Sequence, residues 1–115
     1  MKQFYVYILG NKHRNVVYTG VTSDLVGRAY IHRNDFVDGF SRRYKVHDLV
    51  WYEHHETAES AIRREKQIKK WRRAWKLELI EAANPVWADL AADWYDGPSM
   101  PSFRDGAAEP GMTEK

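Results

Sequence analysis

The first twenty residues constrain the fold most, because they hold two strand-like runs joined by a short polar segment. Residues 3–10 alternate with the period of a β-strand, and residues 16–20 form a second run of β-branched and aromatic residues. The polar residues 11–14 between them are typical of a hairpin loop. We therefore expect an antiparallel hairpin that buries one face, since a few uncovered strands are only marginally stable.

The next stretch predicts a helix and a third strand. Residues 22–24 offer N-cap side chains for a helix over residues 24–36, which should end near Gly39. Residues 46–54 alternate again and are rich in aromatic and β-branched side chains, which predicts the third strand.

Two more helices are predicted after that strand. Thr57 is the N-cap of a long helix that runs to about Trp75 and either breaks there or continues to Ala83. The Asn84-Pro85 pair is a signal to stop and restart, because proline disfavours helix at the preceding residue and suits a first helical turn. A short helix over residues 86–94 is expected to follow.

The length of 115 residues fits one domain, which we place at residues 1–95. From residue 96 onward Gly, Pro and Ser dominate and periodicity is lost, so residues 96–115 are predicted to be a disordered acidic tail. The expected fold is α+β: a small three-stranded antiparallel sheet flanked by helices, in the order β-β-α-β-α-α.

Composition excludes several classes of function. The chain has no cysteine, which rules out disulfides, thiolate zinc sites and a cysteine nucleophile. No apolar run approaches the roughly 18 residues of a membrane span, and the N-terminus lacks the apolar stretch of a signal peptide. We expect a soluble cytoplasmic protein with no membrane partner.

The charge is distributed unevenly along the chain. Residues 1–76 hold 16 Lys or Arg against 8 Asp or Glu, a net +8, whereas residues 77–115 hold 2 against 8, a net −6. A basic body suggests a polyanionic partner. The alternative is a charged surface that serves only solubility.

Two tyrosines of the hairpin are candidates for chemistry. If the loop has two or four residues, the pairing is symmetric about Lys12-His13 and places Tyr7 directly opposite Tyr18. Directly opposed side chains share a face, with Cβ atoms about 4.5–5.5 Å apart. The alternative is an ordinary aromatic cross-strand pair, and an odd loop length would put the two rings on opposite faces.

Arg28 and His32 lie four residues apart on the first predicted helix and so share one of its faces. An arginine beside a histidine, near aromatic hydroxyls, suits phosphate binding because a guanidinium matches phosphate oxygens in a bidentate manner. The alternative is a solvated polar face.

Glu65 is the acidic residue on the inward stripe of the long helix, whose members are Ala58, Ala61, Ile62, Ile68 and Trp75. A buried carboxylate must be paired, neutral or bound to a metal. The functional interpretation is a Mg²⁺ ligand, and the alternative is a salt bridge to an inward-leaning arginine. We expect one metal rather than two, because Asp24 fits an N-cap better than a second ligand.

The same helix carries a dense set of positive charges. Residues 63–76 hold eight Lys or Arg, interleaved with Trp71 and Trp75. Such a surface suits phosphate contacts and electrostatic steering to nucleic acid, although a solvated helix face is the alternative.

Taken together, these features resemble the GIY-YIG nuclease superfamily, in particular its small stand-alone bacterial members. The first motif is Tyr5-Val6-Tyr7, with Tyr5 in place of its glycine, and the second is Tyr18-Thr19-Gly20, with Thr19 in place of its isoleucine. The resemblance covers roughly residues 3–90. Further matching stretches are Val21 to Leu25, Arg28 with His32, Arg42 to Lys45, Arg63 to Trp71 and Asn84 to Trp87.

The resemblance implies a metal-dependent endonuclease that hydrolyses phosphodiester bonds in DNA, with a role in DNA repair or processing. Tyr7 and Tyr18 would be active-site tyrosines, one of them the base that activates water, and Arg28 would stabilise charge on the phosphate. Glu65 would hold one Mg²⁺ or Mn²⁺. The residues implied to assist catalysis are His32 and Tyr44.

DNA is thus the expected partner, with no small-molecule cofactor and a monomer favoured. One alternative is a nucleic-acid-binding module without catalysis that uses the same basic helix, and another is a structural or partner-binding domain. His47, His54 and His55 match nothing in the family and are expected at the surface. The residues expected to contact nucleic acid are Arg42, Arg43, Lys45, Arg63, Lys66, Lys69, Lys70, Arg72 and Arg73.

Overall fold

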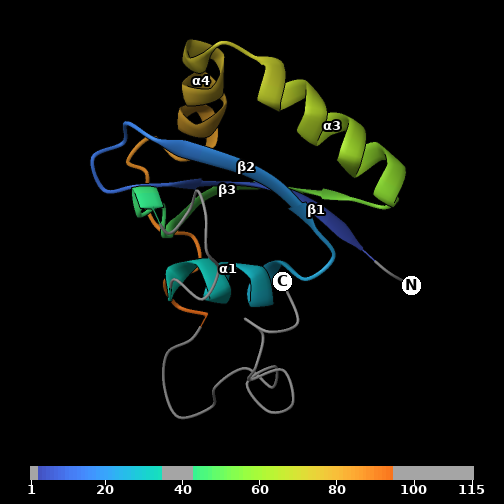
Figure 1. Ribbon diagram of the computed structural model, residues 1–115, viewed down its shortest axis with the longest axis horizontal. Helices are drawn as coiled ribbons and strands as arrows, with labels where there is room; N and C mark the ends of the chain where they lie inside the picture. The colour runs from blue at the N-terminus through green and yellow to red at the C-terminus, as the bar shows by residue number, and fades with distance from the viewer. Residues whose placement is uncertain (1–2, 35–42, 95–115) are drawn as a thin grey trace.

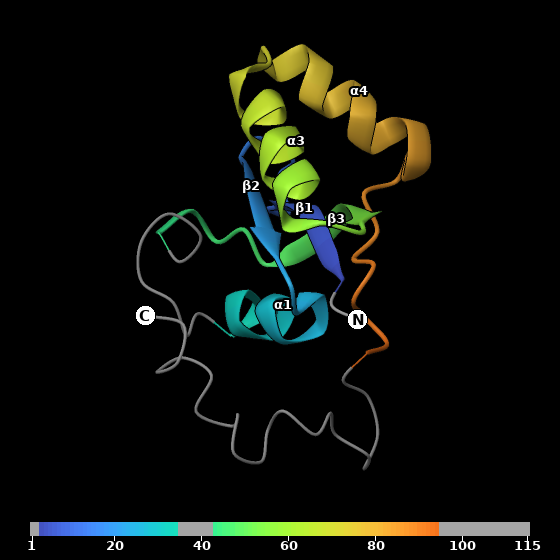
Figure 2. The ribbon, with the colours of Figure 1, turned by 90° about the vertical axis from the view of Figure 1, so that its right-hand side faces the viewer.

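The computed structural model describes residues 3–34 and 43–94, and within them it contains one antiparallel sheet with helices on both faces (Figure 1). The sheet order is β2-β1-β3, with β1 in the centre. Figure 2 shows α1 below the sheet and α3 with α4 above it. This is the predicted α+β fold in the predicted order. The elements are β1 (Phe4–Gly10), β2 (Val17–Thr22), α1 (Leu25–Arg33), β3 (Asp48–His55), α3 (Ala58–Lys70) and α4 (Arg73–Ala83).

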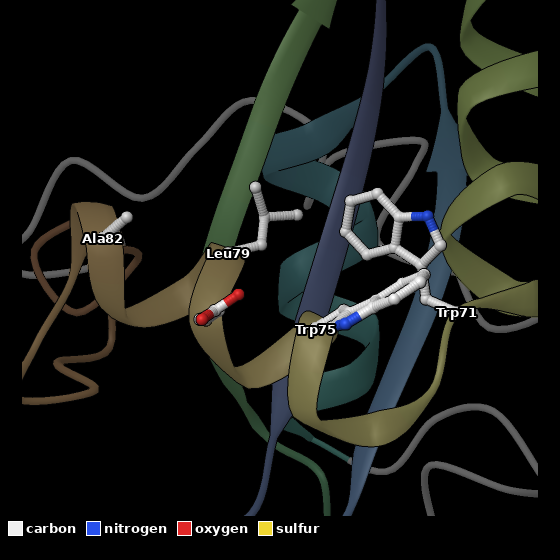
Figure 3. Close-up of a pocket in the computed structure, with 5 residues that line it drawn as sticks. Trp71, Trp75, Leu79 and Ala82 are labelled. Carbon is white, nitrogen blue, oxygen red and sulfur yellow. The ribbon is translucent and has the colours of Figure 1, made fainter.

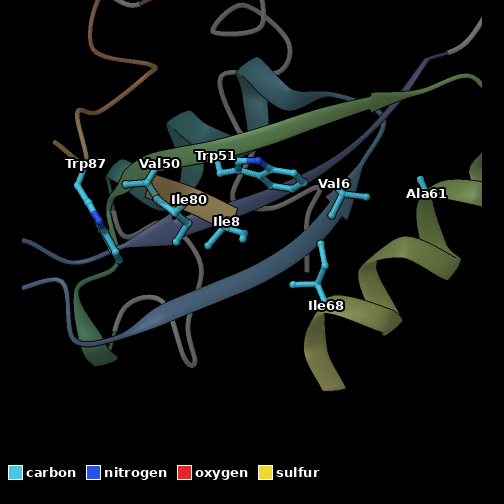
Figure 4. Close-up of a cluster of buried hydrophobic side chains, with 8 residues drawn as sticks. All are labelled: Val6, Ile8, Val50, Trp51, Ala61, Ile68, Ile80 and Trp87. Carbon is cyan, nitrogen blue, oxygen red and sulfur yellow. The ribbon is translucent and has the colours of Figure 1, made fainter. Parts of the chain in front are cut away.

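The central strand β1 separates two hydrophobic clusters, because successive side chains of a strand point to opposite faces. Val6 and Ile8 point toward α3 and α4, whereas Tyr7 and Leu9 point toward α1. The side chains buried with Val6 and Ile8 are Val50, Trp51, Ala61, Ile68, Ile80 and Trp87 (Figure 4).

The first helix is shorter than predicted. It ends at Arg33, three residues before the expected end at residue 36. Asn34 is the C-cap, and its side-chain amide donates to the carbonyl oxygen of Tyr30 at 2.9 Å. The backbone N–H of Asn34 donates to the same carbonyl oxygen at 3.1 Å, so backbone and side chain of the cap both close the last turn. Gly39, the predicted stop, lies outside the described residues.

The long helix breaks earlier than expected. Trp71 and Arg72 both have extended backbone, with ψ of 151° and 157°, so α3 ends at Lys70 and α4 resumes at Arg73 and runs to Ala83. Because the helix is interrupted, Trp75 no longer lies on the same face as the buried residues of α3, and Trp75 is 50% exposed. Ile62 is also wrongly placed in the core by the sequence pattern and is 42% exposed.

The helix predicted over residues 86–94 is not present; this segment forms turns and irregular backbone. The reason is the buried side chain of Asn84. Its amide donates to the carbonyl oxygens of Val50 and Ala88 at 3.0 and 2.9 Å, and its oxygen accepts from the Ala88 N–H at 2.9 Å. These bonds tie the segment to β3, and Trp87 then adopts a left-handed φ of 57°.

Two other expectations concern the limits of the domain. Among residues 3–34 and 43–94, no helix combines the length and apolar character that crossing a membrane requires. The predicted tail, residues 96–115, lies outside the described part of the chain.

Candidate active site

Tyr7 and Tyr18 share the face of the sheet that is turned toward α1. The register pairs Tyr7 with Gly20 and Leu9 with Tyr18, so the tyrosines are diagonal neighbours with ring centroids 6.4 Å apart. Their predicted direct opposition is therefore wrong, whereas their placement on one face agrees with the structure.

Gly20 is what allows the two phenols to converge. A β-carbon on Gly20 would lie 2.5 Å from both Cζ and Oη of Tyr7, closer than real β-carbon contacts come. The ring of Tyr7 therefore crosses the backbone of β2 at Gly20 and leans toward Tyr18. The glycine of the second motif is required by this close approach.

The first helix brings an imidazole to the two phenols. His32 is only 3% exposed, and its ring centroid lies 5.6 Å from that of Tyr18 and 6.2 Å from that of Tyr7. The alternative of a solvated polar face is thus wrong for His32. Arg28 lies one helical turn earlier and is half-buried.

The start of α1 is fixed by Asp24. Its Oδ1 accepts from the backbone N–H of Gly27 at 3.0 Å, which makes Asp24 the N-cap of the helix. The carboxylate is therefore engaged as a cap, as the sequence indicated, and α1 is held in the register that carries His32 to the tyrosines.

Glu65 lies on α3, on the other face of the sheet, and is linked to Tyr18 through Lys69. Its side chain is 12% exposed, and its Oε2 accepts from Lys69 Nζ at 2.7 Å. The ammonium of Lys69 also lies 6.0 Å from the ring centroid of Tyr18. Because β2 is an edge strand, Lys69 on α3 can reach a tyrosine that faces α1. A salt bridge to Glu65 is present, but its partner is a lysine one turn later rather than an arginine.

The donor set at Glu65 fits a lightly coordinated hard cation. Within the described ranges, no group of three or more His, Asp or Glu side chains is arranged to hold a metal. Mg²⁺ commonly binds through one or two carboxylates and keeps several waters. Glu65 is a nearly buried carboxylate whose ion-pair partner, Lys69, is half exposed. Glu65 could hold such a cation once Lys69 is displaced from it.

Tyr44 lies beside the hairpin loop and is 43% exposed. It lines a cavity of about 250 Å³ with basic and polar residues, and a second of about 350 Å³ that includes Val17, next to Tyr18. The side chains that share these two cavities with Tyr44 include Lys12, His13, Lys45, His47, Arg73 and Lys76.

Four of these residues were missed as candidates. Lys12 and His13 belong to the hairpin loop, His47 was assigned to the surface without a role, and Lys76 belongs to α4. Their only signal in the sequence is positive charge near a motif. His55, expected at the surface, instead bonds Ser60 and Glu53 at 2.8 Å each and helps to hold the start of α3.

The predicted nucleic-acid contacts form an exposed basic surface. Arg43 and Lys45 are exposed beside the cavities, whereas Arg42 lies outside the described residues. The exposed cations on α3, α4 and their junction are Arg63, Lys66, Lys69, Lys70, Arg72 and Arg73.

Asp48 marks the far end of this basic region, at the start of β3. Burial and the neighbouring carboxylate of Asp89 raise the pKa of Asp48, and the nearby side chains of Lys12, Arg33 and His47 oppose that rise. Arg33 pairs with Asp89, which also accepts from the Leu49 N–H at 3.0 Å. These contacts tie α1, β3 and the C-terminal segment together.

The chain is similar in sequence to known proteins. The family model of the GIY-YIG catalytic domain matches residues 3–78, the part of the chain that holds every candidate catalytic residue. A UPF0213 protein of Clostridium perfringens is 38% identical over 78 residues, covering 68% of this chain and 83% of that protein. A UPF0213 protein of Staphylococcus saprophyticus is 32% identical over 80 residues, covering 70% and 96%.

A solved structure is also similar. The solution NMR structure of a UPF0213 protein from Bacillus halodurans is 26% identical in sequence. The match covers 79% of this chain and 97% of that one, with a TM-score of 0.49.

Proposed function

The chain belongs to the GIY-YIG catalytic domain family, and from this premise we propose that it is an endonuclease that hydrolyses phosphodiester bonds in DNA with one divalent metal. The observation that carries the proposal is the meeting of Tyr7, Tyr18 and His32 with the Glu65–Lys69 pair at the edge of β2. Hydrolysis of a phosphodiester needs a base, a charge clamp and, in most cases, a metal.

The two tyrosines have different surroundings, which suggests different roles. Tyr7 is 2% exposed and confined over Gly20, whereas Tyr18 is half-buried on the edge strand beside Lys69. We assign Tyr18 as the base. The water oxygen bonds to phosphorus and gives its proton to Oη of Tyr18. The bond from phosphorus to the leaving sugar oxygen breaks, and that oxygen takes up a proton from solvent. Tyr7 and His32 hold the ring of Tyr18 in place.

The remaining residues bind and polarise the phosphate. Arg28, one turn before His32, supplies a planar guanidinium to the phosphate oxygens. Glu65 would hold the divalent cation, with Lys69 displaced toward solvent. When bound, such a cation polarises a phosphoryl oxygen and stabilises the charge that develops there.

Nicking of supercoiled plasmid DNA by the purified protein tests the proposal directly. Nicking should occur in Mg²⁺ or Mn²⁺, stop in EDTA and return when metal is restored. Tyr18→Phe should bind DNA as the wild type does and nick it about 10²-fold or more slowly. If neither metal supports nicking by the wild-type protein, the endonuclease proposal is wrong.

The exposed basic surface of α3 favours a second candidate, a nucleic-acid-binding module without catalysis. That protein would show salt-dependent DNA affinity, because phosphate contacts release counterions. It would never nick DNA. Filter binding over a range of salt, run beside the nicking assay, separates the two functions.

A further inference from the structure

The junction of α3 and α4 holds an aromatic pocket that the proposed chemistry does not use. It has a volume of about 550 Å³ and is lined by Trp71, Trp75, Glu78, Leu79 and Ala82. Figure 3 shows the two indole rings side by side at its wall, with Leu79 and Ala82 from α4 extending the lining. The rings meet edge to face with centroids 6.2 Å apart. The extended residues 71 and 72 create this arrangement, because they interrupt the helix between the two tryptophans.

The pocket is flanked by positive charge. The guanidinium carbon of Arg72 lies 5.4 Å from the ring centroid of Trp75, and that of Arg64 lies 5.5 Å from the ring centroid of Trp71. Arg64 is also held by Glu53 at 3.0 Å, so its position is fixed, whereas Arg72 is exposed. Lys70 stands next to Trp71 and is exposed as well. Aromatic faces interleaved with such cations are the means by which proteins bind single-stranded nucleic acid.

Glu78 indicates which part of a nucleotide the pocket takes. Its carboxylate lies in the lining, where it would repel a phosphate. A carboxylate does accept hydrogen bonds from exocyclic amines such as cytosine N4. The pocket therefore suits a base, while the cations around it suit the phosphates on either side.

The pocket is also close enough to serve the candidate active site. Trp71, the C-cap of α3, follows Glu65 by six residues, so the two lie about 9 Å apart along the helix axis and point about 120° apart around it, at about 1.5 Å and 100° per residue. Lys69, which touches Glu65, precedes Trp71 by two residues. A flexible single strand whose phosphate lies at Glu65 would pass around the end of α3 to place a nearby base at the tryptophans.

We propose that the pocket formed by Trp71 and Trp75 stacks an unpaired nucleobase of the strand that enters the active site. This inference rests on the proposed function for its substrate and goes beyond it by assigning a base-binding site. It makes the protein selective for nucleic acid with an unpaired stretch, since bases within a duplex are not available to stack.

The test measures binding in EDTA, where no cleavage occurs. The probe is a fluorescein-labelled 12-nucleotide oligo(dC), compared with the same strand in a duplex. Wild-type protein should bind the single strand more tightly, and Trp75→Ala should weaken that binding about 5- to 150-fold, the range for the loss of one stacked base. Duplex binding should change little. Trp75→Tyr, which keeps an aromatic face, should retain most of the affinity.

The control removes an aromatic of similar exposure elsewhere. Tyr52 is 42% exposed and lies in a different pocket, beside Tyr5 and Trp94, so Tyr52→Ala should bind oligo(dC) as the wild type does. Equal affinity of Trp75→Ala and wild type for oligo(dC), or an equal loss in Tyr52→Ala, would overturn the proposal. A protein that shows Trp75-dependent binding but never nicks DNA would refute the endonuclease and leave the base pocket standing.

Discussion

The ring of Tyr7 crosses the backbone of Gly20 so closely that no side chain fits between the two strands at that point. A β-carbon on Gly20 would lie 2.5 Å from the Tyr7 hydroxyl oxygen and from Cζ. The second motif thus contributes more than Tyr18: its glycine sets the position of the tyrosine supplied by the first motif.

Gly20→Ala should therefore damage both stability and activity. The added methyl group must displace the ring of Tyr7, and overpacking of this kind costs about 1–3 kcal/mol of unfolding free energy. Urea denaturation measures that loss, and nicking by the remaining folded protein should be largely abolished because Tyr7 no longer supports Tyr18. An alanine variant with wild-type stability and wild-type nicking would show that Tyr7 is not confined in this way.

Tyr18→Phe should slow DNA nicking by about 10²-fold or more, the usual scale for loss of a general base. The ring, its packing against His32 and its contact with Lys69 remain, so thermal stability and DNA affinity should stay close to wild type. The matched control is Tyr52→Phe, at an exposed tyrosine of the same sheet. If Tyr18→Phe nicks DNA at the wild-type rate while Tyr7→Phe does not, the base is Tyr7 and the assignment made here is reversed.

Asp48→Asn should raise the melting temperature at pH 7. The pKa of Asp48 is raised in the folded protein, so folding favours its protonated form and its ionisation lowers stability as pH rises. The gain in Asp48→Asn should therefore be full at neutral pH and vanish as pH falls below the ordinary value of about 3.8, where Asp48 is protonated in both states. Glu56→Gln, at an exposed carboxylate, serves as control. A gain that persists unchanged at pH 3 would point to a cause other than ionisation.

The hairpin illustrates what the sequence could predict and what it could not. Both strands follow from alternation alone, and the shared tyrosine face follows when the loop between them has an even number of residues, as it has between Gly10 and Val17. The register does not, because it depends on the loop: Asn11 Oδ1 accepts from the N–H groups of Asn15 and Val16, and Arg14 adopts a left-handed φ of 59°. These local bonds move the centre of the turn one residue later than predicted. The partner of Tyr7 thus shifts by two residues, which preserves the face.

The C-terminal half of the described chain differs more from the helices that its sequence predicts, because contacts with distant residues determine its backbone. Nothing in local propensity shows that the amide of Asn84 will bond the backbone of β3, yet those bonds replace the helix expected after Pro85. Trp75 fits a buried stripe only while the helix is continuous, and the extended residues 71 and 72 end it. The spacing of apolar residues predicts that Glu65 faces inward. It does not predict that Lys69 contacts both Glu65 and Tyr18, because that arrangement depends on how α3 packs at the edge of β2.

Glu65→Gln tests whether Glu65 holds the metal on which cleavage depends. The substitution keeps the shape of the side chain but removes the charge that a hard cation requires. Glu59→Gln is the matched control, since Glu59 lies on the same helix and is 84% exposed in its ion pair with Arg63.

The measurement is the rate of plasmid nicking in Mg²⁺ for both variants and the wild type, with melting temperatures taken on the same samples. We expect Glu65→Gln to melt near the wild-type temperature, to bind DNA in EDTA at least as tightly as wild type, and to show no Mg²⁺-dependent nicking. Glu59→Gln should nick normally. A Glu65→Gln protein that nicks at the wild-type rate in Mg²⁺, or that loses nicking only in proportion to its loss of folded protein, would contradict the metal role of Glu65 and the mechanism built on it.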